Sequence, residues 1–172
     1  MLDEQDPQKK VKLEKAAFAA GCFWGVEEIF TQVKGVVRTT SGYAGGTLGN
    51  PSYKDVCSGN SGYAETVEVE FDPAAVSYEK LLDIFWDIHD PTTPNRQGPD
   101  IGSQYRSVIF YYTPQQEEAA LASKSNVAQS GKYGNPISTE IVAAKEFYKA
   151  EEYHQRYCQK HGMKATCHIP LK

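Results

Sequence analysis

The chain has 172 residues, of which 40% are hydrophobic and 23% charged, and a formal net charge of −4. This composition is typical of one globular domain, which can bury a core without metals or disulfides. The negative charge and the lack of a dense lysine or arginine run exclude nucleic acid and anionic membranes as partners. No apolar stretch has the length needed to span a bilayer.

The N-terminal residues 1–14 are charged and aperiodic, and they predict a mobile tail ahead of a single domain over residues 15–172. The start lacks the apolar core of a secretion signal, so we expect a cytoplasmic protein. Four cysteines are too few for a disulfide scaffold of this length. Cys22, Cys57, Cys158 and Cys167 are therefore expected to be core residues, metal ligands or redox groups.

The first half of the domain alternates between strands and a helix. Apolar residues predict a buried strand over 15–21, and helical spacing predicts a helix over 22–33. A strand over 35–46 ends in a glycine loop, and the loop 50–62 holds at most one helical turn.

Strict alternation over residues 63–71 predicts a half-exposed strand. Glu68 and Glu70 share one face of this strand. If the apolar residues on the other face form the core, Glu65 points inward with them.

The second half begins with a helix over 77–90, capped by Ser77. An irregular functional loop over 91–104, a strand over 105–112 and a helix over 113–130 follow. A strand over 136–144 and a last helix over 150–162 precede a mobile tail with Cys167. The fold class is α+β, a two-layer α/β sandwich with a central mixed, mainly antiparallel sheet and long loops around the site.

The stretch "GCFWG" places Cys22 at the N-terminal edge of a predicted helix. Unpaired backbone amides and the helix dipole favour a thiolate there, which predicts a lowered pKa and a nucleophile. Phe23 and Trp24 could wall a pocket for a small methyl-bearing group. The alternative is a structural cysteine, since cysteine is among the most buried residue types.

Four motifs occur in one order: "GCFWG", "GYAGG", "NPSYKDVCSGNSGYAE" and "HDPTTPNRQGPDIGSQYRS". Together they resemble the peptide methionine sulfoxide reductase A family over residues 17–168. The resemblance implies reduction of the S epimer of methionine sulfoxide, free or in proteins, as a repair of oxidative damage. It also implies thioredoxin as the external reductant, with no bound cofactor.

The resemblance also assigns roles to residues of this chain. Cys22 corresponds to the family's nucleophile, and Phe23 and Trp24 to its pocket for the substrate methyl group. Further matches to the family's site are Tyr53, Glu65, Asp100 and Tyr105.

The chemistry of a sulfoxide explains these residue types. Its oxygen is a poor leaving group until it gains a proton, which a carboxylic acid kept neutral by apolar surroundings can supply. Glu65 is the candidate acid, and the Tyr53 and Tyr105 hydroxyls can hydrogen-bond the same oxygen. The Cys22 sulfenic acid left by oxygen transfer condenses with a second thiol to a disulfide.

Two cysteines are candidates for that second thiol. Cys167 lies in a glycine-containing tail, where family members place a resolving cysteine. Cys158 departs from the family, which usually has an apolar residue there, and it is a possible second resolving thiol in a relay. Cys57 has no assigned redox role, and Tyr63 stands where the family commonly has histidine.

Three alternatives remain open. Cys158, His161, Cys167 and His168 could form a zinc module, although the adjacent last two point apart in an extended strand. A cysteine hydrolase would use Cys22 with His154 as its base. A peptide-binding module would hold methionine without turning it over. We expect no bound metal and a monomer.

Overall fold

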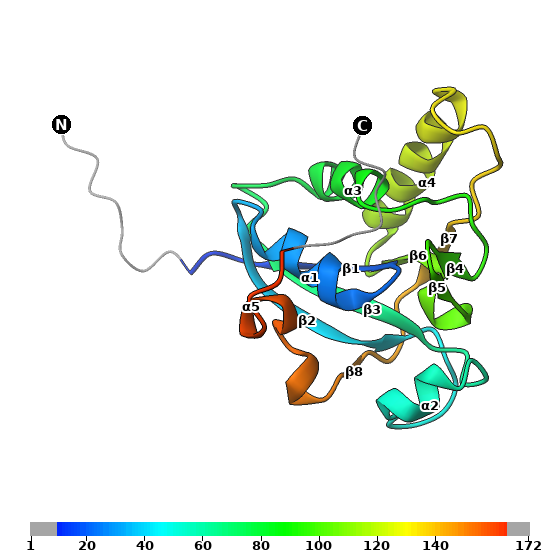
Figure 1. The fold of residues 1–172 in the computed structure, drawn as a ribbon. Helices are drawn as coiled ribbons and strands as arrows, with labels where there is room; N and C mark the ends of the chain where they lie inside the picture. Colours follow the sequence, from blue (N-terminus) through cyan, green and yellow to red (C-terminus); the bar gives the residue numbers. More distant parts are fainter. Residues whose placement is uncertain (1–9, 165–172) are drawn as a thin grey trace.

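A six-stranded sheet runs through the computed structural model, which describes residues 10–164 (Figure 1). Its spatial order is β7-β6-β1-β3-β2-β8, and only β6 and β7 pair in parallel. The remaining neighbours are antiparallel, which confirms the mixed, mainly antiparallel sheet. The strands are β1 (Glu14–Ala20), β2 (Val36–Ala44), β3 (Ala64–Phe71), β6 (Ser107–Tyr111), β7 (Glu140–Ala143) and β8 (Tyr148–Lys149).

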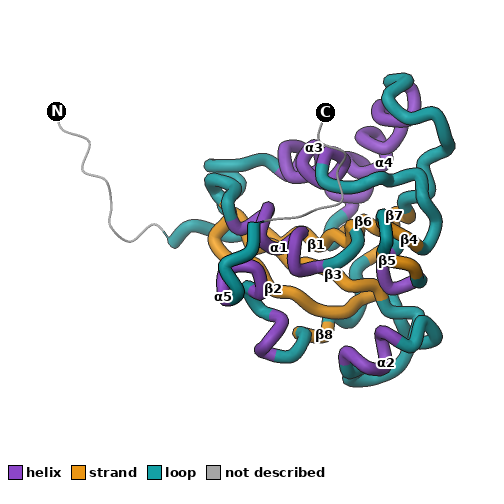
Figure 2. Tube along the Cα trace, viewed as in Figure 1, coloured by secondary structure: helices purple, strands orange, loops and turns teal. Residues whose placement is uncertain are grey.

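Three helices cover one face of the sheet (Figure 2). They are α1 (Phe23–Thr31), α3 (Tyr78–Asp87) and α4 (Pro114–Gln129). The aromatic ring of Phe18 on β1 stacks on Phe30 of α1 at 5.2 Å between centroids and on Phe85 of α3 at 5.4 Å. This large-residue core confirms the α+β sandwich.

The opposite face of the sheet buries a smaller cluster, in which four alanines lie beside Val108 and Phe110. Ala17, Ala19, Ala44 and Ala64 are buried there, and Phe147 packs against them from the segment between β7 and β8. Small side chains let this segment lie close to the sheet, so no helix is needed on that side.

The predicted helix starts agree with the caps. The Ser77 hydroxyl accepts from the Lys80 amide at 3.0 Å, and the Thr113 hydroxyl accepts from the Gln116 amide at 3.1 Å. Residues 50–62 contain the short helix α2 (Tyr53–Cys57), opened by a capping box between Ser52 and Asp55. These local signals are strong enough to define the helix starts.

Several predicted segments differ in the structure, among them the strand 136–144, of which only β7 (Glu140–Ala143) forms. The loop 91–104 contains a small hairpin of β4 (Arg96–Gln97) and β5 (Asp100–Ile101). The predicted strand 105–112 begins only at Ser107, because Tyr105 lies in the 3₁₀ turn η1 (Ser103–Tyr105).

The predicted helix 150–162 is wrong. The segment forms a 3₁₀ turn η2 (Glu152–His154) and a single turn α5 (Tyr157–Lys160). Arg156 between them has a φ of +52°, a left-handed conformation that interrupts a right-handed helix.

Candidate active site

Cys22 caps the N-terminus of α1, directly after β1, as the sequence predicts. The residue before it, Gly21, has a φ of +96°, and a Cβ there would lie 2.9 Å from Cγ of Gln97. Only glycine fits this close contact without strain. The hairpin β4–β5 therefore packs directly on the backbone that carries the thiol.

Glu65 points inward from β3 toward α1 and is 2% exposed. Its Oε1 accepts from the Phe23 amide at 3.2 Å, next to Cys22 in the chain. Its Oε2 is buried and has no hydrogen-bond partner among the described residues. The pKa of Glu65 is raised to about 8, chiefly by burial and to a smaller extent by the charge of Asp100, while the bond from the Phe23 amide opposes the rise. Glu65 is therefore a neutral acid at pH 7, with one oxygen available to a ligand.

The pKa of Cys22 is raised to about 12, chiefly by burial and then by the charge of Glu65. The Trp24 amide lowers this pKa, as expected at a helix N-terminus, but its effect is smaller. The prediction of a lowered pKa for Cys22 is therefore wrong in this structure. The contribution of Glu65 operates only where that carboxyl is ionised, so burial dominates at neutral pH.

Two phenols lie at the same site, Tyr53 at the start of α2 and Tyr105 at the end of η1. Burial raises the pKa of each, and the charge of Glu65 contributes to both shifts. The charge of a Cys22 thiolate is a further, smaller cause of the raised pKa of Tyr105. Both hydroxyls therefore keep their protons and remain donors near the thiol and the acid.

Asp100 belongs to the same electrostatic group. It is half-buried in β5, and its charge raises the pKa of Cys22, Glu65 and Tyr105. Five of the predicted site residues, Cys22, Tyr53, Glu65, Asp100 and Tyr105, thus lie close enough to act on one another's charges, although the chain separates them by up to 83 positions.

An aromatic wall adjoins the thiol. Phe23 is buried, and the half-buried Trp24 ring stacks on Tyr157 with centroids 3.8 Å apart and planes 8° from parallel. The ring of His154 lies between Phe23, at 5.1 Å, and Tyr53, at 4.4 Å. The predicted apolar wall is thus larger than "GCFWG" alone, because the C-terminal segment completes it.

His154 has a different role from the one a hydrolase requires. Its Nδ1 accepts from the indole Nε1 of Trp24 at 3.0 Å, and burial lowers its pKa. A base for Cys22 would instead accept from the thiol. His154 and Tyr157 stand three residues apart, but the left-handed Arg156 lies between them, so helical spacing does not predict their place in the wall.

Glu27, which is 1% exposed, binds the backbone of the C-terminal segment, residues 150–158. Its Oε1 accepts from the Arg156 amide at 2.6 Å, and its Oε2 accepts from the Thr39 hydroxyl at 3.0 Å. The sequence analysis missed this residue. Its signal was a carboxylate four residues after Phe23 and three before Phe30, on the apolar face of α1.

Glu151 and Gln155 add further bonds. Glu151 accepts from the Tyr43 hydroxyl at 3.0 Å and from the Tyr53 amide at 3.2 Å. Gln155 accepts from the Ser41 amide at 2.9 Å and donates to the Ser41 carbonyl at 2.8 Å. These contacts hold residues 150–158 against β2 and the start of α2. The segment therefore does not form a separate helix.

The remaining predicted cysteines differ in their surroundings. Cys158 is 3% exposed and its thiol donates to the Trp24 carbonyl at 3.4 Å. Cys57 is exposed and hydrogen-bonds to the Tyr53 hydroxyl. Cys167 and His168 lie outside the described residues. Within residues 10–164 no group of three potential metal ligands occurs.

Tyr63, where the resemblance leads us to expect histidine, anchors a loop. Its hydroxyl donates to the Leu48 carbonyl, and a Cβ on Gly46 would lie 2.4 Å from its ring. The tyrosine therefore holds the glycine loop after β2 by packing and one hydrogen bond.

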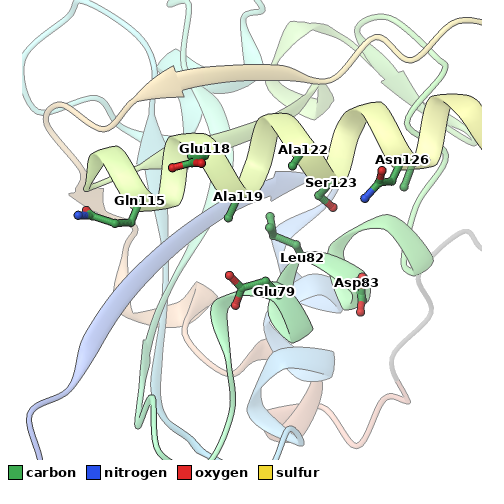
Figure 3. Close-up of a pocket in the computed structure, with 10 residues that line it drawn as sticks. Glu79, Leu82, Asp83, Gln115, Glu118, Ala119, Ala122, Ser123 and Asn126 are labelled. Atoms are coloured by element: carbon green, nitrogen blue, oxygen red, sulfur yellow. The ribbon is translucent and has the colours of Figure 1, made fainter.

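A separate cavity of about 480 Å³ lies between α3 and α4 (Figure 3). Glu79, Asp83 and Glu118 line it together with Leu82 and Ala119. It contains none of the predicted site residues.

Among the described residues no helix has both the length and the apolar character to cross a membrane.

Comparison with known proteins agrees with the site. Residues 14–172 match the family model described as peptide methionine sulfoxide reductase. A protein of Methanosarcina acetivorans named "Peptide methionine sulfoxide reductase MsrA" is 62% identical over 150 residues, which cover 87% of this chain and 80% of that protein.

Solved structures of Mxr1 from Saccharomyces cerevisiae are also similar. The reduced form superposes with a TM-score of 0.84 at 38% identity, over 94% of this chain and 91% of Mxr1. Mxr1 in complex with Trx2 superposes with a TM-score of 0.61 at 28% identity, over 90% of this chain and 91% of Mxr1. The cysteine, buried acid and phenols described above thus belong to an enzyme that reduces methionine sulfoxide, and the chain is a member of the peptide methionine sulfoxide reductase family.

Proposed function

We propose that the enzyme reduces the S epimer of methionine sulfoxide, both free and in proteins, with Cys22 as the nucleophile and Glu65 as the proton donor. The observation that carries this proposal is the buried Glu65 carboxyl, which has one oxygen on the Phe23 amide and a pKa of about 8. A neutral acid beside a thiol is suited to a reaction in which a sulfoxide oxygen must gain a proton.

The reaction has two steps at Cys22, which are reduction of the sulfoxide and then resolution of the sulfenic acid. In the first step the atoms move as follows. The cysteine sulfur attacks the substrate sulfur, the oxygen takes a proton from Glu65, and oxygen transfer leaves methionine and a Cys22 sulfenic acid. The methionine sulfur gains two electrons and the Cys22 sulfur loses two. Tyr53 and Tyr105 donate hydrogen bonds to the same oxygen, and removal of one such donor typically costs about 100-fold in rate.

Substrate orientation comes from the aromatic wall and Asp100. Phe23 and Trp24 receive the terminal methyl group, and the Trp24 ring is held by Tyr157 and His154. Asp100 lies within the electrostatic reach of Cys22 and Glu65, where it can accept from a substrate amine or amide. A pocket with a fixed methyl side and a fixed oxygen side discriminates between the two sulfoxide epimers.

Cys167 then resolves the sulfenic acid. Its thiol condenses with Cys22 to a disulfide and releases water. A dithiol such as thioredoxin reduces this disulfide by thiol exchange. The related Mxr1 in complex with Trx2 supports thioredoxin as the partner. We place the reaction in a monomer in the cytoplasm, with residues 15–172 as one catalytic domain.

A relay through Cys158 is a second route. The Cys158 thiol donates a hydrogen bond to the Trp24 carbonyl, and its charge contributes to the raised pKa of Cys22. The two thiols are therefore close enough to interact electrostatically. A disulfide from Cys22 to Cys167 could pass to Cys158. If Cys158 stays alkylatable after one turnover without reductant, the relay does not operate.

The test is NADPH consumption with thioredoxin and its reductase on separate S and R sulfoxides of a methionine peptide. Cys22→Ser should abolish turnover, and Cys167→Ser should keep the first reduction while losing thioredoxin-supported turnover. Equal rates on both epimers, or an active Cys22→Ser variant, would contradict the proposal.

A further inference from the structure

We propose that Arg106 is a positioning residue of the active site, which fixes the acid Glu65 relative to the phenol Tyr105 by binding the backbone of both their segments. Its side chain is 16% exposed. The guanidinium Nη1 donates to the Ser103 carbonyl at 2.9 Å, and Nη2 donates to the Gly62 carbonyl at 2.8 Å. The inference rests on the proposed roles of Glu65 and Tyr105.

The two carbonyls belong to the segments that carry the site. Gly62 stands three residues before Glu65, at the entry to β3, and Ser103 begins the 3₁₀ turn that ends at Tyr105. One rigid, planar group thus joins both segments within a few residues of the reacting groups. A shift of either carbonyl would be passed on to Glu65 or Tyr105 through only two or three peptide units.

Two further groups lie close to the guanidinium, which also lines a cavity beside β7. A Cβ on Gly45, just after β2, would lie 2.9 Å from Nη2, and Glu140 of β7 lies 3.9 Å from Nε. Another hydrogen bond, from the Ser103 hydroxyl to the Gly59 carbonyl at 3.1 Å, joins the same two loops. Arg106 is therefore the half-buried part of the junction between these loops, and it contributes two of the three hydrogen bonds named here.

Arg106 acts on Glu65 through the backbone and not through its charge. The causes of the Glu65 pKa shift are burial, the Phe23 amide and Asp100. Lysine keeps the positive charge but concentrates it on one nitrogen, which cannot reproduce the planar fork on two separate carbonyls. Lysine should therefore fail to replace arginine here.

The test compares Arg106→Lys with wild type in a single-turnover reduction of an S-sulfoxide peptide, which requires neither thioredoxin nor Cys167. A displacement of about 1 Å of catalytic groups can cost roughly 100-fold in rate, so we expect a fall of this order in the rate constant at saturating peptide. The alkaline limb of the pH–rate profile should move to lower pH, because water that reaches Glu65 lowers its pKa. Arg38→Lys is the matched control, since Arg38 is exposed and makes one surface ion pair with Glu70.

Thermal melting separates positioning from stability, with rates measured well below the melting temperature of each variant. If Arg106→Lys does not fold, Gly62→Ala perturbs the same junction at a φ of +79° and should lower the rate in the same direction. A wild-type rate and an unshifted pH profile in the folded variant would overturn the inference. An inactive wild type would instead refute the proposed function.

Discussion

Glu65→Gln should stabilise the protein at alkaline pH. The pKa of this carboxyl is raised from 4.5 to about 8, chiefly by burial, so the folded protein binds its proton more tightly than the unfolded chain does. The stability gained from that proton is complete below pH 4.5 and is lost as the pH rises through about 8. Glutamine keeps the shape and the acceptor for the Phe23 amide but cannot ionise.

The magnitude follows from the shift. One pKa unit corresponds to about 1.4 kcal/mol, so ionised Glu65 costs about 5 kcal/mol above its folded-state pKa. At pH 7 the cost is already about 3 kcal/mol, because the unfolded chain ionises first. The free energy of unfolding of Glu65→Gln minus that of wild type should therefore rise steadily between pH 4.5 and 8 and then level off.

The assay is urea unfolding under reducing conditions at each pH from 4 to 9, followed by circular dichroism. Glu70→Gln is the matched control, because Glu70 lies on the opposite face of the same strand in an ion pair with Arg38. Its difference from wild type should stay within about 1 kcal/mol. A constant difference for Glu65→Gln, or a wild type that gains on the variant as the pH rises, would refute the buried neutral acid.

Three further predictions concern the same site. Single-turnover reduction should slow about tenfold per pH unit above pH 8 as Glu65 loses its proton, which a series from pH 5 to 10 measures. Gly21→Ala, with its Cβ 2.9 Å from Gln97, should lower stability by about 1–3 kcal/mol in urea unfolding and reduce activity. Glu27→Ala strips the Arg156 amide of its buried acceptor and should cost about 1–3 kcal/mol in the same assay.

Local patterns in the sequence predicted much of this fold. Ser77 and Thr113 marked helix starts because their hydroxyls satisfy amides within the same turn. Alternation over 63–71 predicted an inward Glu65, since the period of a strand decides which face each residue takes. The motifs then predicted which residues would meet, and the structure brings Cys22, Glu65 and Tyr105 together.

The errors have long-range causes. The helix 150–162 is broken because Glu27, 129 positions away, accepts from the Arg156 amide and holds that residue in a left-handed conformation. The hairpin within 91–104 depends on Gln97, which bonds the Asp90 amide at 3.0 Å and packs on Gly21. The pKa of Cys22 depends on how much protein surrounds it, which no local pattern records.

The raised pKa of Cys22 is compatible with the role of nucleophile that we propose for it, provided that Glu65 takes the thiol proton. At neutral pH both groups are protonated, and the reactive thiolate is scarce. Once Glu65 gives its proton to a sulfoxide oxygen, it becomes a buried base that can take the proton of Cys22. In this proposed sequence the thiolate forms only beside a substrate, so the resting thiol would be a poor target for oxidants.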